Sequence, residues 1–184
     1  MTPPPDVAYA KILAANGPKM LALAGEVADG AFPTLVPPEF TAHARAVLGP
    51  HKLLIIGLTC AMDDDPAAAA ALTRQFVSTT IGRPGSPCAA NLTRLGYSSE
   101  KLSEGSDRVV DAVLGHGGPD AIAAKVGEHL KAGADHVRVS MVVPDFASGF
   151  LQLERAAPAF SAWPVGMPRR GQPPDGRRRR PTPM

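Results

Sequence analysis

Residues 12–34 contain the pattern whose residue types and spacing could bind an anion. Asn16 and Gly17 end a short apolar run, and Pro18 follows with the fixed φ that suits a first helical position. Free amides at such a helix start, reached across a glycine that lacks a Cβ, favour an anion such as a phosphate. An ordinary turn between a strand and a helix has the same signature, so both interpretations stay open at this point.

The residues around this turn predict the elements that position it. A strand is expected over 12–15 and a second one over 31–35, which ends near Thr34. Between them, a helix is expected to begin at Pro18 and to end at Gly30. Its apolar stripe, predicted to pack on a sheet, consists of Met20, Leu23, Ala24, Val27 and Ala28.

Other groups capable of chemistry give weaker signals. The five histidines are scattered, at His43, His51, His116, His129 and His136. His129 and Glu128 share a helix with Lys125 and Lys131, which favours a solvated face over a site. His136 begins a strand, at the end that contributes to stability rather than to chemistry in a barrel. No hydrolase, nucleotide-binding or metalloprotease motif occurs, so no catalytic residue is assigned.

Neither the acidic nor the sulfur-containing residues predict a metal site. Asp63, Asp64 and Asp65 precede Pro66, where a capping role for Asp65 is favoured over a metal cluster. The only two cysteines, Cys60 and Cys88, are far apart and are not at the ligand spacing of a zinc site, so both are expected to be reduced.

Composition and charge describe a globular body with a basic end. The chain has 184 residues, is 45% hydrophobic and carries a net charge of +2. Residues 169–184 hold six of the nineteen Lys and Arg residues, among Pro and Gly, and are expected to be disordered. Nucleic-acid binding through this tail is disfavoured because no aromatic residues lie between the arginines. No membrane span or secretory signal is predicted, so a cytoplasmic location is expected.

Between the ends, apolar runs of strand length alternate with helical periods. A strand is expected over Leu53–Ala61, helices over 66–81 and 89–95, a helix capped by Ser106 and Asp107, and a last strand over 137–143. About four strands, each next to a helix, predict a parallel α/β fold.

Four separated blocks then carry a family resemblance. They are GPKMLALAGEVADG at 17–30, LGP at 48–50, GSDRVVDAV at 105–113 and HLKAGADHVRV at 129–139. In this order they resemble the C-terminal half of the luciferase-like monooxygenase family, and within it the oxidoreductases that use the deazaflavin coenzyme F420. The resemblance covers roughly residues 11–143.

This resemblance implies a TIM barrel with the coenzyme at the C-terminal ends of the strands. Asn16, Gly17 and Pro18 would approach the phosphate or ribityl part of coenzyme F420, or of FMN as the alternative, and Thr34 would add a hydroxyl there. The implied activity is hydride transfer between a deazaflavin or flavin and a small organic substrate.

Family members are nearly twice as long, so the expected fold is a partial TIM (β/α)8 barrel of about four parallel strands. The expected organisation is a disordered N-terminus at 1–10, a half barrel at 11–160 and a disordered Pro/Arg-rich tail at 161–184. The inner barrel face should be apolar and unpaired, which predicts a homo-oligomer or aggregate. The alternative function is an inactive fragment that acts as an oligomerising or partner-binding module.

Overall fold

The computed structural model describes residues 9–63 and 65–160. The strands are β1 (Ile12–Leu13), β2 (Gly30–Ala31), β3 (Leu53–Ala61), β4 (Leu114–His116) and β5 (His136–Met141). The helices are α1 (Pro18–Val27), α2 (Pro38–Leu48), α3 (Pro66–Phe76), α4 (Pro87–Arg94), α5 (Ser99–Glu104), α6 (Asp107–Val113), α7 (Pro119–Lys131) and α8 (Phe146–Phe160), with a π-helical turn, η1 (Val77–Ile81), after α3. Of the disordered segments predicted at 1–10 and 161–184, residues 1–8 and 161–184 lie outside the described residues.

All strand pairs are parallel, and β3 is the central strand of the sheet. Strands β2 and β4 lie on the same edge of β3, β2 beside its start and β4 beside its end. The backbone groups of Leu53 and Ala61 both form their hydrogen bonds on this edge. The other edge pairs with β5 from Ile55 to Cys60. The predicted partial-barrel α/β fold is confirmed, with β4 as an additional strand that the sequence did not indicate.

The two faces of the sheet differ in chemistry. Alternate residues of β3, namely Leu54, Ile56, Leu58 and Cys60, are buried under the helices. The opposite face, the inner face of a barrel, carries Leu53, Ile55, Gly57, Thr59 and Ala61 of β3 together with Arg138 and Ser140 of β5. The predicted apolar inner face therefore holds for β3 but not for β5, which directs its valines toward the helices and its polar residues away from them.

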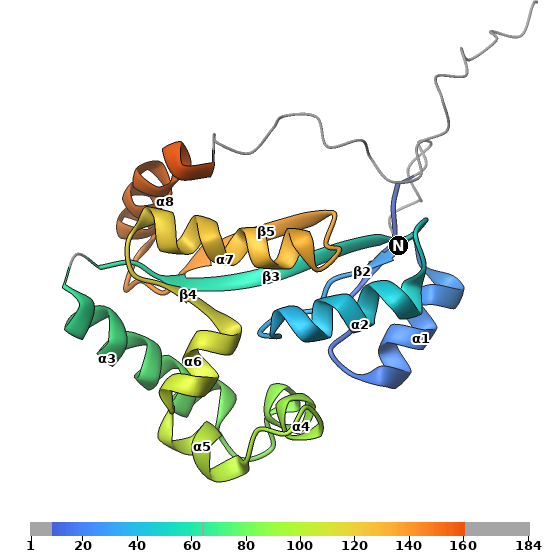
Figure 1. The fold of residues 1–184 in the computed structure, drawn as a ribbon, viewed down its shortest axis with the longest axis horizontal. Coiled ribbons are helices and arrows are strands. Elements are labelled where there is room, and N and C mark those ends of the chain that lie inside the picture. The colour runs from blue at the N-terminus through green and yellow to red at the C-terminus, as the bar shows by residue number, and fades with distance from the viewer. Residues whose placement is uncertain (1–8, 64, 161–184) are drawn as a thin grey trace, which may run out of the picture.

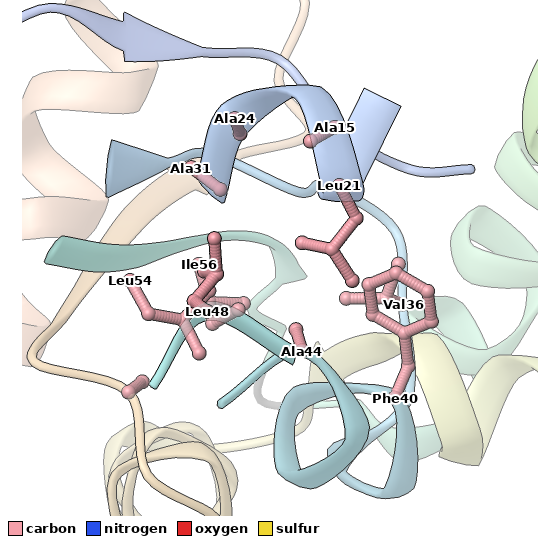
Figure 2. Packing of buried hydrophobic residues seen from close by; sticks show 11 residues of the cluster. Ala15, Leu21, Ala24, Ala31, Val36, Phe40, Ala44, Leu48, Leu54 and Ile56 are labelled. Atoms are coloured by element: carbon pink, nitrogen blue, oxygen red, sulfur yellow. The ribbon is translucent and has the colours of Figure 1, made fainter. Parts of the chain in front are cut away.

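The first core cluster joins α1 and α2 to the sheet (Figure 2). Ala24 and Ala28 of the predicted stripe are buried together with Leu21, whereas Met20, Leu23 and Val27 are 41%, 40% and 55% exposed. Helix α1 has two apolar stripes, and the spacing of its apolar residues does not show which of the two is buried. Packing against the helix and loop that contribute Phe40 and Val36 selects the Leu21 stripe, as Figure 2 shows.

Helices α3 to α6 form a lobe after β3, below the sheet in Figure 1. The cap predicted for α3 is confirmed, because the Asp65 carboxylate accepts a hydrogen bond from the Ala67 amide at 2.9 Å. Ser106 is the N-cap residue of α6 as predicted, but its hydroxyl makes no capping bond. Helix α5 was not predicted, because its six residues are too few to show a period.

Helices α7 and α8 cover the outer face of β5 and the end of β3. In Figure 1, α7 crosses in front of the sheet. Helix α8 begins at Phe146, five residues after β5 ends. No helix within the described residues is long and apolar enough to cross a membrane.

Candidate functional site

The structure brings Asn16, Gly17, Pro18 and Thr34 together at one end of β1 and β2. The Asn16 carboxamide donates to the Thr34 carbonyl at 2.8 Å and accepts from the Thr34 amide at 2.9 Å. Thr34 in turn forms a parallel bridge with Gly57 of β3. These contacts join β1, β2 and β3 in one layer at the C-terminal ends of the first two strands, which is the edge where barrel enzymes place their sites.

The backbone next to this layer is strained. Leu35, directly after Thr34, has a φ of +52°, which is unfavourable for a side chain branched beyond Cβ. Its buried side chain packs in the core of the α3–α6 lobe, which holds it in this conformation. A larger residue cannot replace Gly57 without a shift of its neighbours, because a Cβ there would lie 2.5 Å from the Thr34 methyl group. The layer is therefore fixed tightly by its neighbours.

The start of α1 presents free hydrogen-bond donors. Gly17 is the N-cap residue with no side-chain cap, and Pro18 occupies the first helical position. The first helical bond runs from the Leu21 amide to the Gly17 carbonyl at 2.9 Å. The amides of Lys19 and Met20 precede this bond, so they have no acceptor within the helix. The first turn contains no acidic side chain, which leaves the positive end of the helix dipole uncompensated.

Helix α4 places a cation over this helix start. An Arg94 guanidinium nitrogen, Nη2, lies 3.4 Å from where a Cβ on Gly17 would stand. The same nitrogen donates to Asn91 Oδ1 at 3.1 Å. Asn91 is 2% exposed, and its Nδ2 is buried without a hydrogen-bond partner among the described residues.

A second contact fixes α4 on the same turn. Asn16 Nδ2 lies 3.7 Å from the sulfur of Cys88, which is half-buried near the start of α4. Burial raises the pKa of the Cys88 thiol, and the Asn16 contact lowers it by a smaller amount. The thiol is therefore a packing contact here rather than an activated nucleophile, in agreement with the prediction that it is reduced.

The inner face of the sheet adds a second cation. Arg138 of β5 is the register partner of Gly57, and its guanidinium lies 5.3 Å from the centroid of the Phe32 ring. This distance is within the range of a cation–π contact. The sequence shows Arg138 only as a polar residue between two valines, and the register that brings it beside Gly57 is a tertiary feature.

A cleft of about 360 Å³ opens at the C-terminal end of β5. Its walls are mostly apolar, and its polar groups come from Gln75 and Thr79. The lining residues are Leu72, Gln75, Phe76, Thr79, Val142, Val143 and Pro144. The cleft can accept an apolar group of a small molecule, which fits a mostly apolar binding site with few polar groups.

The histidines do not join this site, and one prediction about them was wrong. His129 was expected on a solvated face, but it is fully buried, with Nδ1 2.8 Å from the Thr41 hydroxyl. Burial lowers its pKa to about 4, with a further lowering by Lys125. The helix period placed His129 beside charged neighbours, but α2 packs against this side of α7 and excludes water.

The acidic segment before α3 does not form a metal site within the described residues. Asp63 Oδ1 accepts from the Asp65 amide at 2.9 Å, and Asp65 caps the helix. Asp64 lies outside the described residues. No group of His, Cys, Asp and Glu in the described part of the chain has the arrangement of a metal centre.

The family model of the luciferase-like monooxygenases matches residues 2–136. This chain belongs to that family. The match covers more than half of the chain and includes the Asn16–Thr34 layer and the α3–α6 lobe. A search of curated proteins found no match.

Solved structures with the same fold agree with this membership in the luciferase-like monooxygenases. The coenzyme F420-dependent tetrahydromethanopterin reductase from Methanopyrus kandleri is 24% identical, with a TM-score of 0.64 over 81% of this chain. An F420-dependent secondary alcohol dehydrogenase in complex with an F420–acetone adduct is 15% identical, with a TM-score of 0.57 over 85% of the chain. EDTA monooxygenase from Chelativorans sp. BNC1 is 16% identical, with a TM-score of 0.55 over 88%.

The match covers only part of each of the three solved proteins. The chain covers 50%, 50% and 46% of the three solved chains, so it spans about half of their length. At these identities the likeness establishes a shared fold.

Proposed function

We propose that this chain forms the coenzyme-binding half of an oxidoreductase that transfers hydride between a deazaflavin or flavin and a small organic substrate. The observation that carries the proposal is the Asn16-Gly17-Pro18 turn, held to Thr34 at the C-terminal edge of the sheet. Membership in the luciferase-like monooxygenases supports it, as do two structural relatives that are described as F420-dependent.

The donors at the turn fit a coenzyme that carries a phosphate. Gly17 places no side chain over the start of α1, and the Lys19 and Met20 amides are free to bind an anion. The nearby Arg94 guanidinium adds positive charge. Coenzyme F420 and FMN both have such a phosphate, so this feature supports either one, with F420 proposed first because of the relatives.

When bound, the coenzyme supplies the hydride donor or acceptor, and the protein supplies position and electrostatics. Asn16 positions Thr34, whose hydroxyl is available to the coenzyme at the end of β2. The free amides of α1 bind the phosphate. The cleft lined by Phe76 and Val143 excludes water from an apolar part of the substrate.

Equilibrium titration with F420 and with FMN tests this proposal. Gly17→Val is expected to abolish coenzyme binding because its methyl groups would cover the free amides. Gly118→Val is the matched control, since Gly118 is also the N-cap residue before a proline, at the start of α7, and a Cβ there meets nothing within 4 Å. Unchanged binding in Gly17→Val would contradict the proposal, whereas equal loss in both variants would indicate general misfolding.

Turnover by this chain alone is expected to be negligible. Hydride transfer requires donor and acceptor to be held at near-attack distance, and a loss of positioning removes orders of magnitude in rate. The inner face at Gly57 and Arg138 is covered by no strand among the described residues. Deazaflavin absorbance would be followed for the chain alone and after adding the N-terminal half of a homologous barrel. Restored turnover would support the proposal, and robust turnover alone would contradict this expectation.

A second candidate function is an oligomerising or partner-binding module without catalysis. It is favoured by the open edges of the sheet, because β1 and β5 each pair with one strand only among the described residues. Such edges present unpaired backbone groups that recruit another strand. Light scattering at micromolar concentration tests it, and a monomer that unfolds cooperatively would contradict it.

A further inference from the structure

We propose that two copies of this chain close one barrel, in which β5 of each copy pairs with β1 of the other and α8 packs beside α1 at both junctions. The partner is thus a second copy, related to the first by a two-fold axis that runs along the strands. This inference rests on the second candidate function for the association itself. It adds which surfaces meet, and it does not depend on coenzyme binding.

The first argument is that the two open edges of the sheet are complementary. Strand β5 pairs only with β3 and β1 only with β2, so among the described residues each has one edge without a strand. All pairs in the sheet are parallel. A rotation about an axis along the strands does not reverse their direction, so β5 of one copy meets β1 of the other as a further parallel pair. A closed dimer therefore covers both edges at once.

The second argument is the number of strands. Four strands lie side by side across the sheet, in the order β1, β2, β3 and β5, because β4 shares one edge of β3 with β2. Two copies supply the eight strands of a closed (β/α)8 barrel. The chain also spans about half of each solved relative. A second copy therefore has the number of strands that completes the ring.

The third argument is where the exposed apolar side chains lie. Of the ten large hydrophobic side chains that are exposed in the described part of the chain, seven belong to α1 and α8. These two helices lie at opposite ends of the molecule in Figure 1. The α1 stripe consists of Met20, Leu23 and Val27, and the α8 stripe of Phe146, Phe150, Leu151 and Leu153. Apolar surface gathered in this way marks an interaction site.

The spacing within each stripe fits the packing of one helix on another. The α1 stripe has its residues at i, i+3 and i+7, and three of the four residues in the α8 stripe are at i, i+4 and i+7. Such spacing places side chains on one side of a helix. Each copy thus has one apolar helix stripe at each end of its sheet, and the dimer brings the two kinds of stripe together.

The two helices also run in the direction that this packing requires. Helix α8 returns along its strand, since Phe160 at its end lines one groove with His136 at the start of β5. Helix α1 does the same, since the Asp29 amide just after it donates to the Lys11 carbonyl before β1 at 2.8 Å. In the ring, α8 of one copy and α1 of the other are therefore parallel neighbours, as consecutive helices of a (β/α)8 barrel are.

Closure also covers the inner face of the sheet. Leu53 and Ile55 of β3 belong to this face and are only half-buried. In the closed dimer the inner faces of the two copies are opposite each other, so these side chains leave water.

The same closure brings together two parts of the candidate site. Asn16 follows β1, and Val142 in the wall of the apolar cleft follows β5. Both lie at the C-terminal end of an edge strand. In the dimer these two ends are neighbours, so the turn of one copy lies beside the cleft of the other.

Size-exclusion chromatography with light scattering tests the assembly, and the unmodified chain is expected to be a dimer. Leu151→Lys in α8 and Val27→Glu in α1 each place a charge in one stripe, at positions that are 64% and 55% exposed. Each variant alone should dimerise about tenfold or more weakly, because the charge would be buried at both junctions. Val47→Glu, at a 45% exposed position of α2, is the matched control and should stay dimeric. Circular dichroism should show that all three variants fold.

A mixture of Leu151→Lys and Val27→Glu tests which surfaces meet. In a mixed dimer one junction contains both substitutions, with opposite charges that face each other, and the other junction is unmodified. The mixture should therefore regain dimers that neither variant forms alone. A contact of β5 with β5 would instead leave Val27→Glu dimeric by itself.

The outcomes separate this inference from the function on which it rests. A monomeric unmodified chain would contradict both the second candidate function and the closed dimer. Association that neither substitution weakens, growth into open polymers, or no recovery in the mixture would overturn the closed dimer alone.

Discussion

The carboxamide of Asn16 pairs with the backbone of Thr34 through both of its polar atoms, at 2.8 and 2.9 Å. The side chain thereby replaces the backbone pairing that β1 and β2 lack beyond Leu13 and Ala31. The donor and acceptor of Asn16 are occupied by Thr34, so we infer that Asn16 positions the site rather than binding the phosphate itself.

Replacing Asn16 is expected to destabilise the fold. Asn16→Leu removes both bonds and leaves the partly buried Thr34 amide and carbonyl without partners, so the free energy of unfolding should fall by about 1–3 kcal/mol. Asn16→Asp keeps the acceptor and should cost less. Urea denaturation measures both values. Equal stability of Asn16→Leu and the unmodified chain would contradict the role of this pair.

The Arg45–Asp135 pair should matter far more than the exposed ion pairs. Arg45 also donates to the carbonyls of Gly133, Gly49 and Lys52, and Asp135 accepts from the Leu54 amide at 2.8 Å. The two side chains are only 12% and 21% exposed. Arg45→Ala leaves four acceptors without their donor, so a loss of about 2–4 kcal/mol is expected.

Thermal or urea unfolding of Arg45→Ala measures this loss. The control is Arg74→Ala, which breaks an ion pair with Asp107 whose side chains are 50% and 69% exposed. That variant should unfold close to the unmodified chain, because solvent screens exposed pairs. A similar loss in both variants would mean that burial of the Arg45 pair contributes nothing.

His129 should make stability depend on pH between about 4 and 6.5. Above pH 6.5 the imidazole is neutral in both the folded and the unfolded chain, so its contribution to stability is fully present. As the pH falls toward 4, the unfolded chain binds a proton that buried His129 does not, and stability falls. The shift from 6.5 to about 4 corresponds to roughly 3 kcal/mol.

Urea denaturation at a series of pH values measures this dependence. His129→Gln is expected to flatten the curve between pH 4 and 6.5, with a constant loss from the weaker contact to Thr41. His51→Gln, at an exposed position after α2, is the control and should leave the slope unchanged. If stability depended on pH equally steeply in His129→Gln and in the unmodified chain, the pH dependence could not be assigned to this imidazole.

The two cysteines should differ in their reaction with thiol reagents. Burial raises the pKa of Cys60 to about 12, and the side chain is fully buried under the helices. Cys88 is only partly buried, so it should be alkylated first, and more slowly than a free thiol because its pKa is also raised. Mass spectrometry after timed treatment with iodoacetamide measures the order in which the two cysteines are alkylated. Faster labelling of Cys60 would contradict this prediction.

The sequence by itself determined the position of the candidate turn and the types of the longer elements, though not of the short β4 and α5. The apolar run at Leu53–Ala61 predicted β3, in which every residue is buried or half-buried and strands lie on both edges. Pro18, Pro38, Pro66 and Pro119 each begin a helix, since their fixed φ and missing N–H suit that position. These are local constraints, and local reasoning finds them.

Tertiary structure decided which faces are buried and which distant groups meet. Two apolar stripes compete in α1, and packing against Phe40 chose the one that includes Leu21. His129 became buried because α2 covers it, and Arg94 reached Gly17 because the α3–α6 lobe folds back onto the turn. The spacing of apolar residues in a sequence shows which faces of a helix or strand can be buried. The surface that packs against the element determines which face is buried, and this surface comes from residues far along the chain.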